Sequence, residues 1–356
     1  MDLNTMKVLV PQCIVKIDGK ELEKSMGYVE SVSVNKTVSE MSNSCDISLF
    51  CNYNAKNSEM GSIFSTADVG KKIEVSMGYE IPKIIFLGFI NSSNVNFGPD
   101  GVQLSISCLD ARAMLMGNNS RETFKENSVS EVVSTLLNTV KQYTTGLEVN
   151  IRQESKDKKV PITQYEVDDY HFLCRLAKLT GSSFYMKGTV LKFVENVYKK
   201  SESSKKKYKW GKDLISFSRN VELSNQIGKV RVNGSDPVTK EMFFEEVQPI
   251  SKSSEGKTGS DASSTVKKKV REVTELSITS REEAKEYATA IMRQCCLDMC
   301  KGRAQIIGDP ALEPGTTVEF DGLDKEINGT YYITGIQHSF GSNGFLTDIS
   351  FCSPTD

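Results

Sequence analysis

Short runs rich in β-branched or aromatic residues dominate the first third of the chain. Between residue 7 and about residue 112 there are seven such runs, and glycine-containing turns separate several of them. Several short strands at this spacing are typical of an all-β domain. The pattern predicts a small antiparallel barrel or sandwich. Its expected strands are Val8–Val10, Cys13–Ile17, Tyr28–Val34, Cys45–Phe50, Lys72–Met77, Ile84–Asn91 and Val102–Leu109.

From Ser128 the apolar spacing changes to three and four residues. Ser128 and Glu131 fit a capping box, S-x-x-E, at the start of a helix. Apolar side chains then recur at helical spacing until Gly146 closes the segment. These side chains are Val129, Val132, Val133, Leu136, Leu137 and Val140.

The stretch QYEVDDYHFLCRLAKLTGSSFYMKGTVLKF, residues 164–193, predicts a second helix followed by a hairpin. Asp168 is placed to cap the helix, and Gly181 is placed to end it in a left-handed conformation. His171 shares its side of the helix with Arg175 and Lys178, so a solvated polar face is favoured over a catalytic role. Residues 115 to 197 therefore read as a small α/β unit.

The second half of the chain repeats the β texture. A charged connector, KKSESSKKKYK, precedes a β segment that starts at Trp210, and 227–234 reads as a strand that enters a turn. Residues 251–269 contain almost no large apolar side chain and predict a mobile loop. Ser280 and Glu283 fit a second capping box. Later strands are expected at Arg303–Ile307, Thr317–Phe320, Tyr331–Ser339 and Phe345–Phe351, a coarse echo of the early β domain.

Composition describes an ordinary globular protein. The chain has 356 residues, 38% hydrophobic and 25% charged, with a formal net charge of -2. This length predicts two or three domains, and the net charge gives no global field toward nucleic acid or anionic membrane. No signal peptide and no apolar run of membrane-spanning length is visible, so we expect synthesis in the bacterial cytoplasm and no membrane insertion.

Candidate chemistry does not assemble into a catalytic motif. The nine cysteines are scattered and only two histidines exist, which disfavours disulfides and a zinc site. Gly256-Lys257-Thr258 lacks the earlier glycine of a phosphate-binding loop, and no G-x-S-x-G elbow is present. The acidic stretch DGLDKEING fits a hairpin turn as well as a cation loop, and the lysine runs fit solvated linkers. We therefore expect a non-enzymatic protein without a cofactor or metal.

Three stretches together resemble one family. The segment YEVDDYHFLCRLAKLTGSSFYMKGTVLKF, then GKVRVNGSDPVTKE, then SREEAKEYATAIMRQ with GRAQIIGDPALEPGTTVEF and NGTYYITGIQHSFGSNGFLTDISF occur in the family's order. This order resembles the phage late control protein D family, which includes contractile-tail baseplate hubs and the first part of VgrG-type spikes. The resemblance covers about 165–351. Its signature positions are Tyr170, Phe172, Leu173, Arg175, Leu176, Ala177, Gly181, Gly234, Asp236, Pro237, Gly308, Pro310, Pro314, Gly315, Tyr331 and His338.

The resemblance implies a β-rich α+β fold with two antiparallel β-barrels of the tail-hub type. Residues 1–114 would form the first barrel and 115–200 the α/β unit. The second barrel would combine 208–250 with 301–353, with 251–300 inserted as a mobile loop and a helix.

The implied function is that of a baseplate hub in a contractile injection particle, such as a phage tail or an R-type bacteriocin. A homotrimer would act as a symmetry adaptor between the sixfold inner tail tube and a threefold spike. Because VgrG-type needle domains do not follow residue 356, the spike is expected to be a separate polypeptide, and other baseplate subunits are possible partners. Two alternatives remain open at this point: a tail-associated cell-wall hydrolase and a receptor-binding baseplate module.

Overall fold

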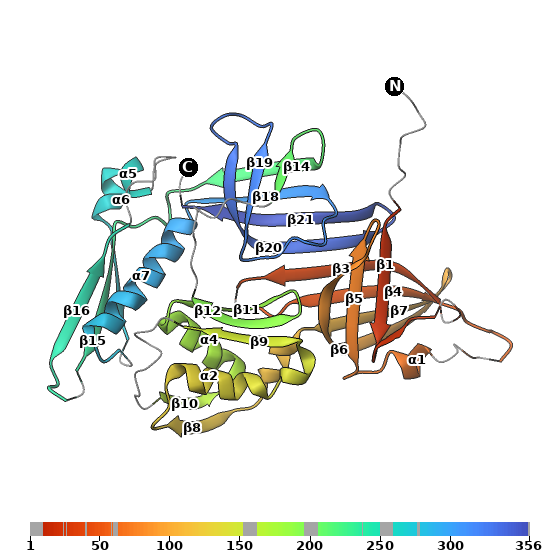
Figure 1. Cartoon of the computed structure of the whole chain (residues 1–356), viewed down its shortest axis with the longest axis horizontal. Helices are drawn as coiled ribbons and strands as arrows, with labels where there is room; N and C mark the ends of the chain where they lie inside the picture. Colours follow the sequence, from red (N-terminus) through yellow and green to blue (C-terminus); the bar gives the residue numbers. More distant parts are fainter. Residues whose placement is uncertain are drawn as a thin grey trace.

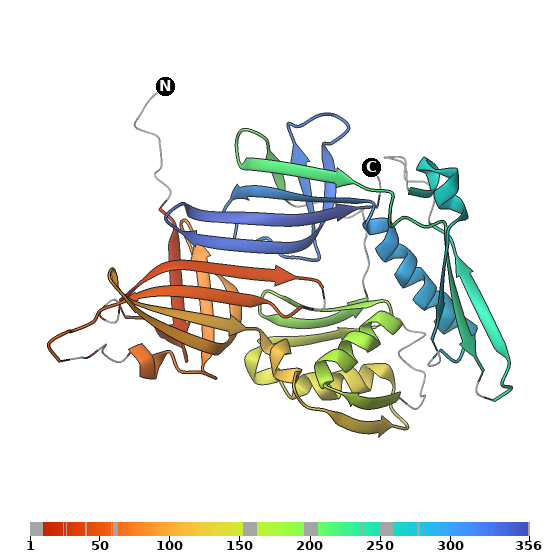
Figure 2. The same cartoon turned by 180° about the vertical axis from the view of Figure 1, so that it is seen from behind.

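The computed structural model describes residues 10–354 except 24, 26, 40, 58, 60–62, 152–161, 196–205, 237, 250–258 and 276–277. One 13-stranded sheet runs through the middle of the molecule, and three smaller sheets lie beside it (Figures 1 and 2). The chain is therefore mostly antiparallel β-sheet with few helices, in agreement with the predicted β-rich fold.

The first part of the large sheet is built by residues 12–109. We call six of its strands the first repeat, which has the order β3-β4-β7-β6-β5-β1 in the sheet. The short strand β2 (Lys20–Glu21) extends the edge, and helix α1 (Ile63–Thr66) lies in the loop before β5. The repeat comprises β1 (Gln12–Ile17), β3 (Gly27–Thr37), β4 (Ser44–Cys51), β5 (Lys72–Gly78), β6 (Lys83–Gly98) and β7 (Gly101–Leu109). These strands match six of the seven predicted ones. Of the remaining one, Val8–Val10, residues 8 and 9 lie outside the described residues and Val10 is not in a strand.

The second part of the large sheet is built by residues 207–221 and 300–353. We call it the second repeat, and its pairing order is β14-β18-β21-β20-β19-β13. Its strands are β13 (Lys207–Lys209), β14 (Leu214–Val221), β18 (Cys300–Ile307), β19 (Thr317–Asp321), β20 (Gly329–Gly341) and β21 (Gly344–Ser353).

The two repeats have the same topology. Numbered along the chain within each repeat, the strands pair in the order second, third, sixth, fifth, fourth, first. Register shifts coincide as well, since one lies between Val29 and Ser31 in β3 and its counterpart between Leu214 and Ser216 in β14. One difference remains: β1 pairs with β5 antiparallel, whereas β13 pairs with β19 parallel. The late β domain is thus a structural duplicate of the early one.

A seam joins the repeats into one sheet. Strand β20 of the second repeat pairs antiparallel with β3 of the first, from Gly335 opposite Thr37 to Phe340 opposite Val32. The two repeats are halves of one continuous sheet, and no sheet among the described strands is closed, so the predicted pair of barrels is not confirmed. Two separate apolar cores lie behind these halves, and Phe345 of β21 reaches into the first of them. Local strand patterns cannot reveal this seam, because its two strands lie about three hundred residues apart in the sequence.

The α/β unit follows the first repeat. It contains β8 (Ser120–Phe124), α2 (Val129–Asn138), β9 (Gly146–Asn150), β10 (Ile162–Val167), α4 (Asp169–Leu179), β11 (Ser182–Lys187) and β12 (Val190–Glu195), with the 3-10 turns η2 (Ala111–Leu115) and η3 (Lys141–Tyr143). Both predicted caps are present, because Ser128 and Glu131 form a reciprocal capping box and Asp168 accepts from the His171 N–H. Gly181 has a φ of +61°, which confirms the expected left-handed helix end.

Residues 229–297 form a fourth body beside the two repeats and the α/β unit, which we call the wing. It comprises β15 (Lys229–Ser235), β16 (Met242–Val247), α5 (Gly259–Ala262), α6 (Ser264–Lys268), β17 (Val270–Thr274) and α7 (Arg281–Leu297). Strands β15 and β16, which the sequence assigned to the second barrel, pair with β17 instead and pack against α7. The expected mobile loop is partly helical at 259–268, since Ser263 caps α6 and Val266 is buried. The rest of that loop lies outside the described residues.

Candidate assembly site

A polar face extends across eight consecutive strands of the large sheet, from β14 through the seam to β6. Side chains that share this face follow directly from the cross-strand registers. Hydroxyl and amide side chains predominate on it, and the face turns away from both apolar cores. We call it the polar face. Its members include Ser216, Ser218, Asn220, Gln305, Ser350, Gln337, Ser339, Ser33, Asn35, Ser48, Ser105, Ser107, Ser92, Asn94 and Asn96.

Part of the polar face is hollowed. A depression of about 1230 Å³ lies over β14, β18, β21, β20 and β3, and the end of α7 bounds it through Gln294, Leu297 and Asp298. Charged residues on the face are few and of both signs. The acids include Glu30, Asp46 and Asp348, and the bases include Lys301 and Arg303. Because such a surface keeps its hydroxyl and amide groups hydrated, it suits contact with water more than burial against an apolar partner.

Both ends of this eight-strand run have open edges among the described strands. Apart from a single bridge between Leu214 and Trp210, β14 pairs only with β18. At the other end, β5 pairs with β6 only as far as Phe89. Within the described residues, 91–98 of β6 therefore pair only with β7, and their other edge is open. Open edges carry unpaired backbone groups and are templates for pairing with another chain.

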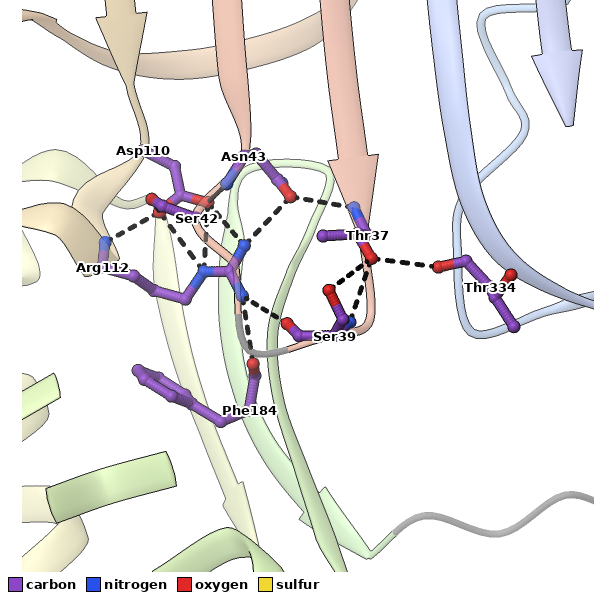
Figure 3. Close-up of polar contacts among 8 residues, drawn as sticks. All are labelled: Thr37, Ser39, Ser42, Asn43, Asp110, Arg112, Phe184 and Thr334. Carbon is purple, nitrogen blue, oxygen red and sulfur yellow. Dashed lines mark hydrogen bonds and ion pairs between the residues drawn. The ribbon is translucent and has the colours of Figure 1, made fainter. Parts of the chain in front are cut away.

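A buried guanidinium joins the first repeat to the α/β unit (Figure 3). Arg112 has no solvent exposure, and its Nη2 lies 2.9 Å from Oδ2 of Asp110. It also donates to the Asn43 side-chain oxygen at 3.0 Å and to the Phe184 carbonyl of β11 at 3.1 Å. The buried ion pair therefore has hydrogen-bond partners on both bodies, which is the condition under which such a pair is tolerated.

The network extends to the second repeat. Asn43 Oδ1 also accepts from the Thr37 N–H at 3.0 Å, and the Thr37 hydroxyl donates to the Thr334 carbonyl of β20 at 3.3 Å (Figure 3). Arg112 thus lies at a junction of three bodies. No sequence motif singles out Arg112. The only signal available was the D-x-R spacing of Asp110 and Arg112 directly after a strand.

A second junction is centred on Glu313. Its Oε1 pairs with the buried Lys36 of β3 at 2.7 Å, and its Oε2 accepts from the Gly188 N–H of the α/β unit at 3.1 Å. One carboxylate in the β18–β19 loop therefore holds both repeats and the α/β unit together. The two junctions fix the orientation of the halves of the polar face.

His338 lies fully buried beside the seam. Its Nδ1 is 2.9 Å from the Thr347 hydroxyl, and Nε2 has no partner within the described structure. Burial lowers the pKa of His338 to about 3, and the Lys36 charge acts in the same direction. The Asp309 charge acts in the opposite direction and raises this pKa. The side chain is therefore neutral at physiological pH. The side chain lies on the core side of β20. The sequence predicts a strand at this position, and the structure confirms it.

The signature residues of helix α4 have packing roles. Five of them are buried in the core of the α/β unit, whereas Arg175 is exposed and pairs with Glu275 of the wing at 3.2 Å. His171 is exposed and binds Asp168 at 2.7 Å, which confirms the solvated polar face. The buried residues are Tyr170, Phe172, Leu173, Leu176 and Ala177.

The remaining signature residues lie in turns and close contacts. A Cβ on Gly308 would meet the Phe345 ring at 2.2 Å, one on Gly234 would meet the Phe243 ring at 2.7 Å, and Gly315 has a φ of +81° against Tyr185. Asp236 accepts from two N–H groups of its turn, at Val238 and Thr239, while Pro237 lies outside the described residues. Pro310 and Pro314 occupy turns between β18 and β19, and the Tyr331 ring contacts Phe351. The described signature residues are spread over three bodies.

The described part of the chain offers no metal centre. No group of three or more His, Cys, Asp or Glu side chains within it is arranged to hold an ion. None of the helices described there is long and apolar enough to cross a membrane.

Solved structures with this fold include tail and secretion proteins. The 43 kDa tail protein of prophage MuSo2 from Shewanella oneidensis has a TM-score of 0.70 at 13% identity, covering 97% of this chain and 100% of its own. A tail protein from Neisseria meningitidis MC58 has a TM-score of 0.71 at 13% identity, covering 97% of both chains. The E. coli c3393 protein, a type VI secretion component with structural similarity to the phage T4 tail proteins gp27 and gp5, has a TM-score of 0.61 at 13% identity, over 95% of this chain and 76% of its own. These likenesses define the fold as that of phage-tail and type VI secretion proteins.

A family assignment follows from the sequence. The family model described as the Alg8 N-terminal domain matches residues 7–341, and the chain belongs to that family. No curated protein matches the sequence significantly.

Proposed function

We propose that the protein is a structural hub subunit of a contractile injection particle, such as a phage tail or a related particle. In this role three copies form a ring that joins a sixfold inner tail tube to a threefold spike made of a separate protein. The α/β unit and the wing brace the ring, and other baseplate subunits contact its outside. The role needs no catalytic group.

The duplication of the β repeat is the observation that carries this proposal. Each chain supplies two repeats of the same topology side by side in one sheet. Three chains would therefore present six similar β units, while the α/β unit and the wing occur once per chain. Such a ring matches a sixfold tube through its repeats and keeps threefold symmetry for the spike.

The polar face supports a position on the inside of the ring. Its hydroxyl and amide side chains run across eight strands, and the hollow lies on the same face. Placed inward, this face lines a hydrated channel, and the two apolar cores lie outside it. In this arrangement each repeat functions as one of the two barrel units expected from the sequence, and the second unit comprises 207–221 with 300–353.

Sedimentation velocity of the purified chain tests the proposal. A ring predicts a species of three times the chain mass, 39.5 kDa, at micromolar concentration or on addition of the spike protein of the same particle. A matched control is the same measurement on the Val221→Pro variant. Because the Glu222 N–H donates to the Met299 carbonyl next to β18, alternation turns the Val221 N–H toward the open edge of β14, where proline removes a backbone donor. A chain that stays monomeric under both conditions contradicts the proposal.

A further inference from the structure

The seam inside the chain offers a template for a contact between chains. Strand β20 is the fifth strand of its repeat, and it pairs with β3, the second strand of the other repeat. The same two positions are open elsewhere: β6 is the fifth strand of the first repeat, and β14 is the second strand of the second repeat. Each chain therefore contains one formed contact of this type and the two halves of another.

The match between β6 and β20 extends to individual residues. Both strands change register with their hairpin partner at the same place, between Ile90 and Ser92 in β6 and between Ile333 and Gly335 in β20. Both then continue to a glycine-bounded turn, 98–101 and 341–344 respectively. Counting from the shifts, Asn94 occupies the position of Gln337.

The match between β14 and β3 is of the same kind. Asn220 of β14 pairs with Lys301 of β18, and Asn35 of β3 pairs with Ser44 of β4. Counted from the register shift, these two pairs occupy the same place in their repeats. By the same count Ser218 corresponds to Ser33. In the seam, Gln337 stands directly opposite Asn35. The equivalent pair between chains is therefore Asn94 opposite Asn220.

From this correspondence we infer that β6 of one chain pairs antiparallel with β14 of the next, in the register of the internal seam. The inference rests on the proposed ring and adds its interface, with a second copy of this chain as the occupant. The expected partners are Ser92 with Glu222, Ser93 with Val221, Asn94 with Asn220, Val95 with Arg219, Asn96 with Ser218 and Phe97 with Phe217.

Strand direction permits this closure. All seven pairings from β14 to β6 are antiparallel, so the first and last of the eight strands run in opposite directions. Placed side by side in a head-to-tail ring, β6 and β14 are antiparallel again, as an unbroken sheet requires. Neither open segment contains proline, so each can donate to the new ladder.

The side chains on both faces of the sheet are compatible with pairing between β6 and β14. On the polar face, Asn94 and Asn96 would meet Asn220 and Ser218, which continues the amide and hydroxyl layer. On the opposite face, Phe97 is 61% and Val221 42% exposed in the single chain. Pairing places Phe97 beside Phe217 of the next chain and covers part of this apolar surface.

Disulfide trapping tests the register. In the seam, Val38 donates to the Thr334 carbonyl, which makes Asn35 and Gln337 a non-hydrogen-bonded pair by alternation. Cross-strand Cα atoms at such pairs lie about 4.5 Å apart, within reach of a disulfide. Asn94→Cys combined with Asn220→Cys should therefore link chains through oxidation of two thiols by diamide, with diamide reduced to its hydrazine.

The readout is non-reducing gel electrophoresis beside sedimentation velocity. The in-register pair, and the neighbouring pair Asn96→Cys with Ser218→Cys, should each give covalent species up to three chains. The matched control Asn94→Cys with Ser216→Cys lies four residues out of register, about 13 Å away, and should remain uncrosslinked, as should each single variant. A trimer that links equally in the control, or in none of the pairs, overturns the interface while leaving the ring. A chain that sediments only as a monomer overturns the ring itself.

Discussion

Arg112 combines complete burial with hydrogen-bonding groups from two separate bodies. Its charge has no contact with water, so its free energy depends on Asp110, Asn43 and the Phe184 carbonyl remaining in place. Removing one partner of a buried ion pair leaves the other charge unpaired in a poorly solvated site. The residue therefore links the stability of the first repeat to the docking of the α/β unit.

Arg112→Ala should lower the free energy of unfolding by about 3–5 kcal/mol. Asp110 then stays buried without its counter-ion, and the β11 carbonyl loses a donor. Urea unfolding followed by circular dichroism measures the change. The control is Arg175→Ala, which removes an exposed pair with Glu275 and should cost less than about 1 kcal/mol. Equal losses in the two variants would contradict the role assigned to the junction.

His338 makes stability depend on pH. Its pKa is about 3 when folded because of burial and the nearby Lys36 charge, against about 6.5 when unfolded. Below pH 6.5 the unfolded chain binds a proton there that the folded chain does not, so stability falls as the pH is lowered. From pH 7 to pH 5 this site should remove about 2 kcal/mol.

The measurement compares the wild-type chain with His338→Gln. Each protein is unfolded in urea at pH 7 and at pH 5, and the change between the two pH values is compared rather than the absolute stability. The variant should lose about 2 kcal/mol less than the wild type over this interval. Parallel pH dependences would mean that His338 does not remain neutral in the folded chain.

At the scale of elements, sequence patterns predict what is local. The caps of α2, α4 and α7 lie at the expected serines and aspartate, because a cap involves only three or four neighbouring residues. Strands β1, β3, β4 and β7 lie where the sequence predicts them and largely alternate in burial. Strands β15 and β16 alternate just as regularly, yet their partners are β17 and α7 rather than the second repeat. Alternation identifies a strand and its buried face, but the choice of partner depends on residues far away in the chain.

The end of β18 packs tightly against β21 at Gly308. A Cβ there would meet the Phe345 ring at 2.2 Å, so Gly308→Ala should destabilise the fold by about 1–3 kcal/mol through overpacking. Gly329→Ala is the matched control, because a Cβ at the start of β20 meets nothing within 4 Å. That variant should be neutral or slightly stabilising, since alanine restricts the unfolded chain. Thermal unfolding of both variants checks the pair, and a neutral Gly308→Ala would contradict the close packing.

At the scale of the whole molecule, two kinds of symmetry coexist in the proposed ring. The β repeats occur twice per chain, whereas the α/β unit and the wing occur once (Figures 1 and 2). The sequence shows only a coarse echo of this duplication, because matched strand order, register shifts and turns are properties of pairing rather than of residue identity. The ring's inner wall should therefore approach sixfold symmetry while its periphery remains threefold.

Electron microscopy of the isolated trimer distinguishes this arrangement from other trimers. Class averages along the axis should show a central hole, an inner wall of six similar densities and three outer projections from the α/β units and wings. The internal seams and the contacts between chains should alternate around the wall at nearly equal spacing, because both use the same pair of strand positions. A wall of only three densities, or an axis without a hole, would mean that the polar face is not turned inward and that the chains associate through their peripheral bodies instead.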